Sequence, residues 1–139
     1  MKIVIDTNVI FAALKSRRGA SYKLLSLLPS KRFSIAISVP LIIEYEDVLR
    51  RGKLPPDITD RDISDLIDFF CHIGDQQDIF FLWRPFLPDP SDDLVLEVAV
   101  AGGCDAIISY NKRHFKNVKK FGLRILDPKE FLTEIGVIS

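Results

Sequence analysis

The β-branched residues 3–5 run directly into an aspartate near the start of the chain. Such a run, without polar alternation, is typical of a strand that is buried on both faces of a parallel sheet. Beyond Asn8 the apolar residues adopt helical spacing, so the chain turns from strand to helix at Asp6. Ligands of open α/β sheets bind at the carboxyl ends of the strands, which makes Asp6 the first candidate for chemistry. The alternative is that Asp6 only caps the following helix.

The rest of the chain alternates between helical and strand-like segments. We expect helices over residues 9–14, 21–28, 40–51, 60–73, 91–101 and 127–135, and further strands over 33–37, 79–83, 106–109 and 123–126. This alternation predicts an α/β fold, a three-layer α/β/α sandwich with a mostly parallel central sheet of about five strands. At 139 residues, we expect one domain over residues 1–139.

Composition narrows the class of protein. With 47% hydrophobic and 27% charged residues the chain has the balance of a soluble globular domain. No apolar run approaches the length of about 20 residues that spans a membrane, and no signal peptide opens the chain, so we expect a cytoplasmic protein. The 19 basic and 19 acidic residues cancel, so a polyanionic partner would need a local basic patch. Cys71 and Cys104 are expected to be small buried hydrophobes in a reducing compartment.

The helix over residues 40–51 carries a second candidate acid. Two of its acids stand four residues before an arginine, which favours surface ion pairs of Glu46 with Arg50 and of Asp47 with Arg51. Glu44 instead lies at the edge of the apolar stripe. A carboxylate there is costly unless a cation meets it, and either a metal ion or a lysine would serve.

A third group of acids, Asp89, Asp92 and Asp93, enters the helix over residues 91–101. First-turn aspartates and a serine cap favour the helix macrodipole, so this group has a purely structural interpretation. Three carboxylates at one helix entrance also form the hard-oxygen environment that Mg²⁺ prefers.

Polar residues follow the predicted strand over 106–109. Ser109 and Asn111 would lie at a strand's carboxyl end, as Asp6 and Asn8 do, although turn capping also explains them. His114 is a candidate general base without an identifiable partner, and a solvated histidine is the favoured interpretation.

These segments together resemble the PIN domain nucleases, and among them the VapC-like toxins of toxin–antitoxin pairs. The matching pieces, in the family's order, are Val4-Ile5-Asp6-Thr7-Asn8-Val9, Pro40 with Glu44 and Val48-Leu49, Asp89-Pro90-Ser91-Asp92-Asp93 with Leu96 and Ala99, and Ala106-Ile107-Ile108-Ser109-Tyr110-Asn111. The resemblance implies a PIN-like α/β/α sandwich in which clustered acids hold Mg²⁺ or Mn²⁺. It also implies hydrolysis of RNA by a metal-activated water.

Carried over by position, Asp6, Glu44 and Asp92 would be the catalytic acids and metal ligands, and Asp93 could share or take the role of Asp92. Asn111 stands where many members carry a fourth acid, which predicts weaker binding of a second metal. Asn8 and Ser109 match positions that support the acids or the attacking water. The resemblance also implies an RNA substrate, a small antitoxin partner and a homodimer.

Two further features concern partners. Basic residues beyond the first helix and beyond the fourth strand could flank the site as an approach for RNA, namely Lys15, Arg17, Arg18 and Lys23, and Lys112, Arg113, Lys116, Lys119 and Lys120. Solvated surface charge is the simpler interpretation of both groups. The aromatic run over residues 79–83, with Phe86, is expected to be a core strand, with a dimer or antitoxin surface as the alternative.

Two rival functions share some of these features. HAD-like phosphatases open with a strand and Asp-x-Asp-x-Thr, but here Asn8 replaces the second aspartate and the acid/base group is missing. The other rival is a PIN-like scaffold that has lost activity and serves as an interaction module. Asn111 favours that rival, whereas Asp6, Glu44 and Asp92 argue against it.

Overall fold

The central element is a five-stranded sheet with the strand order β3-β2-β1-β4-β5, in which every neighbouring pair is parallel. The computed structural model describes residues 1–79, 87 and 89–138. The strands are β1 (Lys2–Ile5), β2 (Ser34–Ile37), β3 (Asp75–Gln76), β4 (Ala106–Ile108) and β5 (Arg124–Leu126). The predicted α/β class with a mostly parallel sheet is therefore confirmed.

Helices connect the strands. They are α1 (Thr7–Lys15), α2 (Ala20–Ser26), α3 (Val39–Arg51), α4 (Asp60–Ile73), α5 (Pro90–Ala101) and α6 (Pro128–Glu134), with a 3₁₀ segment η1 (Lys112–Phe121) between β4 and β5. Local signals set several of the ends. Thr59 and Asp127 open α4 and α6 with reciprocal capping boxes, and Ser38 caps α3 by accepting a hydrogen bond from the Leu41 N–H.

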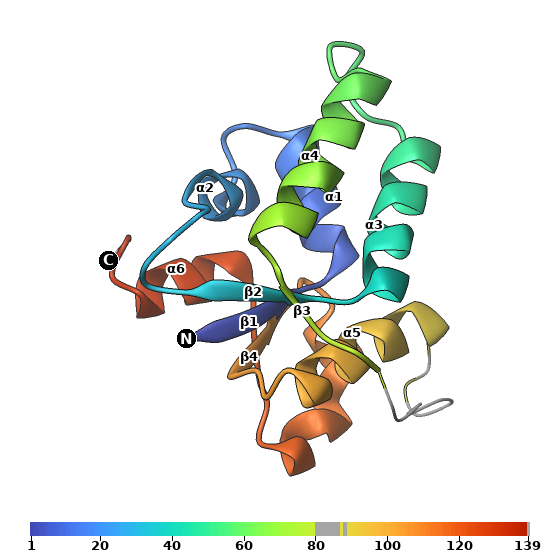
Figure 1. Ribbon diagram of the computed structural model, residues 1–139. Helices are drawn as coiled ribbons and strands as arrows, with labels where there is room; N and C mark the ends of the chain where they lie inside the picture. Colours follow the sequence, from blue (N-terminus) through green and yellow to red (C-terminus); the bar gives the residue numbers. More distant parts are fainter. Residues whose placement is uncertain (80–86, 88, 139) are drawn as a thin grey trace.

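The layers place helices on both faces of the sheet. In Figure 1, α1 to α4 lie above the sheet and α5 lies below it. The chain leaves β1 toward α1 and reaches β4 from α5. The helices connected to these two adjacent strands therefore cover opposite faces of the sheet. This makes the carboxyl ends of β1 and β4 a topological switch point, the usual place of a ligand crevice in an open α/β sheet.

The core follows from the uninterrupted apolar strands. Residues 3–5 of β1 and 106–108 of β4 are all buried, since helices cover both faces of these central strands. Phe33 and Phe131 pack edge to face with ring centroids 5.0 Å apart, which fixes α6 beside the start of β2.

Three sequence expectations need correction or lie beyond the described residues. The expected strand over 79–83 falls outside them except for Ile79, while the third strand of the sheet is the short β3, which the sequence pattern did not indicate. The basic segment after Asn111, for which no helix was expected, forms η1 because the side chains of Phe115 and Val118 are buried on one side of it. Ser91 does not cap α5; Asp89 does, since Pro90 occupies the first helical position.

The two cysteines differ in their surroundings. Cys104 is buried, and burial raises the pKa of its thiol to about 12. Cys71 is exposed on α4, so the expectation that it is buried was wrong. It lies on the outward face of an amphipathic helix whose inward face is formed by Ile63, Ile67 and Phe70. Within the described residues, no helix has the length and apolar character to span a membrane.

Candidate active site

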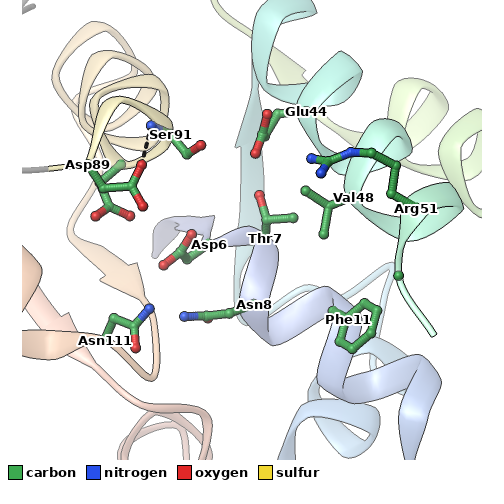
Figure 2. A pocket seen from close by; sticks show the side chains of 12 residues that line it. Asp6, Thr7, Asn8, Phe11, Glu44, Val48, Arg51, Asp89, Ser91 and Asn111 are labelled. Atoms are coloured by element: carbon green, nitrogen blue, oxygen red, sulfur yellow. Dashed lines mark hydrogen bonds between the residues drawn. The ribbon is translucent and has the colours of Figure 1, made fainter. Parts of the chain in front are cut away.

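A pocket of about 430 Å³ opens at the carboxyl ends of β1 and β4. Its walls come from the start of α1, from α3, from the start of α5 and from the loop after β4 (Figure 2). The acids that line it are Asp6, Glu44, Asp89 and Asp92, and the amides are Asn8 and Asn111. Segments far apart in the sequence therefore contribute polar side chains to one concave site.

Asp6 lies directly after β1 and is largely buried. The residue is only 6% exposed, and its backbone N–H donates to the Ile108 carbonyl at 2.9 Å, which fixes it between β1 and β4. The pKa of the Asp6 carboxyl is raised to about 6: burial is the main cause, a hydrogen bond from Ser109 opposes it, and the nearby charge of Asp92 adds to it. Asp6 makes no side-chain cap bond to α1, so the capping interpretation is not supported.

The loop after β4 supports Asp6. The Ser109 hydroxyl donates to Asp6 Oδ2 at 2.6 Å and accepts from the Asn111 N–H at 3.0 Å. The Tyr110 N–H donates to Asn8 Oδ1 at 3.4 Å. Figure 2 shows the side chains of Asn8 and Asn111 facing each other across the pocket below Asp6. Ser109 is fully buried and stands behind Asp6, holding its carboxylate.

Helix α3 presents Glu44 to the pocket. The hydroxyl of Tyr45 donates to the Ile5 carbonyl, which ties the helix to the residue before Asp6. Glu44 is half-buried and points into the pocket from α3 (Figure 2). The neighbouring acids behave as expected: Arg50 pairs with Glu46 at 2.9 Å and Arg51 pairs with Asp47 at 2.8 Å.

The three aspartates at the start of α5 make different contacts. Asp89 caps the helix by accepting from the Ser91 N–H at 2.9 Å, and it also lines the pocket. Asp92 lines the pocket although it is 4% exposed, and burial, then the charge of Asp89, raises the pKa of its carboxyl. Asp93 lies outside the set of described residues that line the pocket. It is buried, and its Oδ1 accepts from the Leu87 N–H at 2.9 Å.

His114 has a partner that the sequence did not reveal. Its Nδ1 lies 3.0 Å from Oδ2 of Asp92, and this contact lowers the pKa of the Asp92 carboxyl against the effect of burial. The expectation of a solvated histidine without a partner was therefore wrong. No spacing signal could have found this contact, because it depends on how η1 packs beside α5.

The sequence model of the PIN domain family matches residues 2–113. The chain belongs to the PIN domain family. The match covers all the lining acids, from Asp6 to Asp92, and also Asn111.

Solved structures show the same fold. The PIN domain resembles a chain of the VapBC2 complex from Rickettsia felis bound to a DNA fragment from their promoter, with 20% identity and a TM-score of 0.64 over 91% of this chain and 100% of that one. It also resembles a chain of VapBC-1 from nontypeable Haemophilus influenzae, with 15% identity and a TM-score of 0.62 over 93% and 99% of the two chains. A comparison with curated proteins finds no match.

The donor set of this PIN domain fits a hard divalent cation. Asp6 and Asp92 are buried carboxylates whose charges disfavour each other, and a cation relieves that cost. Across the described ranges 1–79, 87 and 89–138, no three acidic, histidine or cysteine side chains converge closely enough to enclose a cation by themselves. Mg²⁺ tolerates such an open arrangement, because it takes only one or two protein carboxylates and completes its shell with water and phosphate oxygens.

Proposed function

We propose that this PIN domain is a divalent-metal-dependent endoribonuclease that hydrolyses RNA phosphodiester bonds. The observation that carries the proposal is the position of Asp6, Glu44 and Asp92 around one pocket at the switch point of the sheet, with Asp6 buried and its pKa raised. Asp93 differs, because it does not line the pocket and its carboxylate accepts from the Leu87 N–H.

The proposed roles follow from these contacts. One or two of Asp6, Glu44 and Asp92 would hold Mg²⁺ or Mn²⁺ directly and the rest through water, and the ion when bound supplies an acidified water and positive charge beside the phosphate. Ser109 keeps Asp6 in place and favours its charged form by donating to it. Asn8 and Asn111, which lie below Asp6 in Figure 2, offer amide groups to the substrate or the attacking water.

A basic hollow supports a polyanionic substrate. Residues of η1 and β5 line a cavity of about 720 Å³ that begins at Lys112, next to the pocket residue Asn111. Its basic lining residues are Lys112, Arg113, Lys116, Lys119 and Arg124. Lys112 pairs with Glu130 and Arg124 with Glu134, which leaves the remaining three as the cations best placed for phosphates. The basic residues beyond α1 are exposed as well, with Arg17 only 3.8 Å from Asp57.

We further propose that the chain is the toxin of a toxin–antitoxin pair in the cytoplasm, that it binds a small antitoxin and that it forms a homodimer. The support is the likeness in fold to chains of two VapBC complexes. The alternative function is a catalytically inactive PIN scaffold that binds protein or RNA. Asn111 favours it, because an amide at the pocket wall provides one negative charge fewer than a fourth acid would.

The test is cleavage of a panel of structured and single-stranded RNAs with Mg²⁺ or Mn²⁺. Wild type is compared with Asp6→Asn, Glu44→Gln and Asp92→Asn, and with Glu46→Gln as a matched control on the same helix as Glu44. Cleavage that EDTA and the three pocket substitutions abolish, and that Glu46→Gln retains, supports the proposal. An inert wild type that binds Mn²⁺ no better than Asp6→Asn would contradict it and favour the inactive scaffold.

A further inference from the structure

The pocket has a second side whose chemistry differs from that of the acids. The same pocket that Asp6 and Asp92 line is also lined by Phe11, Val48, Arg51 and Gly52. Figure 2 shows Phe11, Val48 and Arg51 on the side away from Asp6, Asp89 and Asn111. Glu44 is the proposed metal ligand that lies on this side, beside Val48 and Arg51, but cation binding gives no role to the aromatic ring or to the guanidinium.

The ring of Phe11 occupies a place that exists because residue 52 is a glycine. A Cβ at Gly52 would lie 2.2 Å from Phe11 Cε2, so any side chain there would push the ring away. The backbone of Gly52 has a φ of −75°, which any residue can adopt, so the close approach of the ring is what the glycine provides. Phe11 is only half-buried and lines the pocket, which leaves part of its ring available to a ligand.

Arg51 lines the same pocket as Phe11, from the last turn of α3. Its Nε donates to Asp47 Oδ2 at 2.9 Å, and the ion pair restrains a side chain that is still 67% exposed. Lys15 adds a second cation, with its Nζ 5.9 Å from the centroid of the Phe11 ring, near the limit of a cation–π contact. The far side of the pocket therefore combines an aromatic ring, the aliphatic Val48 and the cation of Arg51, while Lys15 contacts the ring from outside the pocket lining.

We propose that Phe11, Val48 and Arg51 form a subsite for one unpaired nucleobase of the RNA, next to the phosphate that lies over the acids. Bases stack on aromatic side chains and on guanidinium planes, and this contact accepts any base because each has a π face. A pocket of about 430 Å³ is within the range of small-molecule sites, roughly 300–1,000 Å³. A base inside a duplex cannot reach the ring, so the subsite selects single-stranded RNA. This inference rests on the proposed nuclease function.

The first experiment measures binding without cleavage. Fluorescence polarisation in EDTA compares a short labelled single-stranded RNA with the same RNA made abasic at every position. Phe11→Leu keeps most of the volume and removes the π face, Gly52→Ala displaces the ring without deleting it, and Tyr22→Ala removes an exposed aromatic outside the pocket as a control. Thermal melting of each variant establishes that it is folded.

The expected result is specific to the base. Phe11→Leu and Gly52→Ala weaken binding of the natural RNA by about 5- to 140-fold, the range for removal of one base–aromatic stack, and leave binding of the abasic RNA unchanged. Tyr22→Ala leaves both unchanged. Equal weakening for natural and abasic RNA would overturn the proposal, as would folded variants that bind like wild type or a wild type that binds neither RNA.

A second measurement separates this inference from the nuclease proposal. In the Mg²⁺ or Mn²⁺ cleavage assay, Phe11→Leu is expected to raise KM by a similar factor with a smaller change in kcat. Base-dependent binding without any cleavage would refute only the proposed nuclease function. Metal-dependent cleavage with an unchanged KM in Phe11→Leu would refute only the subsite, and Phe11 would then be assigned to packing of α1 against the end of α3.

Discussion

The hydroxyl of Ser109 donates a hydrogen bond to Oδ2 of Asp6 at 2.6 Å, although 103 positions of sequence separate the two residues. The contact exists because β4 lies beside β1 in the sheet, with Ile5 opposite Ile108, so the residues that follow these strands meet at one edge. The accepting carboxylate is one whose burial raises its pKa to about 6. Ser109 therefore opposes the effect of burial on the charge of Asp6.

Ser109→Ala should raise the pKa of Asp6 above about 6, because the hydrogen bond that it removes favours the charged carboxylate. A hydrogen bond to a charged group contributes roughly 1.5–3 kcal/mol, which corresponds to a shift of about one to two pH units. The acidic limb of the pH–rate profile, or a ¹³C titration of the carboxyl, measures this. Ser26→Ala, on the exposed side of α2, is the control. An unshifted limb would mean that Ser109 does not influence the charge of Asp6.

Asp6 should make the metal-free protein less stable as the pH rises. Its pKa is raised from 3.8 in the unfolded chain to about 6 in the fold, so the folded state binds the proton more tightly. The contribution of Asp6 to the free energy of unfolding therefore falls as the pH rises between these two values, by about 3 kcal/mol in total, and stays low above them. Asp6→Asn should remove this part of the pH dependence. Chemical denaturation from about pH 3.5 to 7.5 in EDTA measures it, and identical curves for the two proteins would contradict it.

Mg²⁺ or Mn²⁺ should stabilise the protein mainly above pH 6. A cation competes with the proton on Asp6, so the rise in Tm on adding metal should be small near pH 5 and should grow as the pH passes through about 6. Differential scanning fluorimetry over a series of metal concentrations measures the rise. Asp6→Asn should show little rise at either pH. A shift that is equal below and above the pKa of Asp6 would place the cation elsewhere.

Substitutions of Asp92 and Asp93 should affect different properties of the protein, Mn²⁺ affinity and stability respectively. Asp93→Asn weakens a buried bond to the Leu87 N–H and should cost roughly 1–3 kcal/mol of stability, with Mn²⁺ affinity retained. Asp92→Asn should reduce Mn²⁺ affinity and destabilise less, because its raised pKa shows that its charge is unfavourable in the fold. Urea denaturation and calorimetric Mn²⁺ titration separate the two. The opposite pattern would exchange the roles assigned to these neighbours.

The basic hollow should contribute to RNA binding through charge alone. The double variant Lys116→Ala/Lys119→Ala should weaken binding of single-stranded RNA and reduce the slope of log K against log salt by about 0.7 for each phosphate that is no longer neutralised. Lys31→Ala/Arg61→Ala removes two exposed cations away from both cavities and serves as the matched control. Equal slopes for the two double variants would show that the hollow does not bind the RNA.

Much of the fold was predictable because its signals are local. Residues 3–5 and 106–108 are recognisable as buried strands from their own composition, and α4 was predicted with its observed bounds from its periodicity and flanking residues. The short β3 escaped prediction because two exposed polar residues, Asp75 and Gln76, join the sheet only by pairing with β2. The 3₁₀ segment η1 was not predicted because it is mostly basic, and its two buried residues, Phe115 and Val118, give too weak an apolar pattern.

The candidate acids could be identified from the sequence, since acids at strand ends and helix starts stand out locally. The different contacts that these acids make in the fold could not be predicted from the sequence. Only the packing of α5 turns Asp92 into the pocket and Asp93 toward Leu87, and only η1 brings His114 to Asp92. The distinct role of Phe11 likewise depends on the absent side chain at Gly52, where α1 meets the end of α3.

The sequence by itself determined the alternation of strands and helices except for β3 and η1, the parallel character of the sheet and the identity of the candidate acids, because hydrophobic period and capping act over a few neighbouring residues. The tertiary structure alone decided which of these residues meet. Ser109 reaches Asp6, and Phe11 shares a pocket with Asp92, because the sheet and its covering helices bring together segments that are about 80 to 100 residues apart, and burial then sets the charge properties of the site.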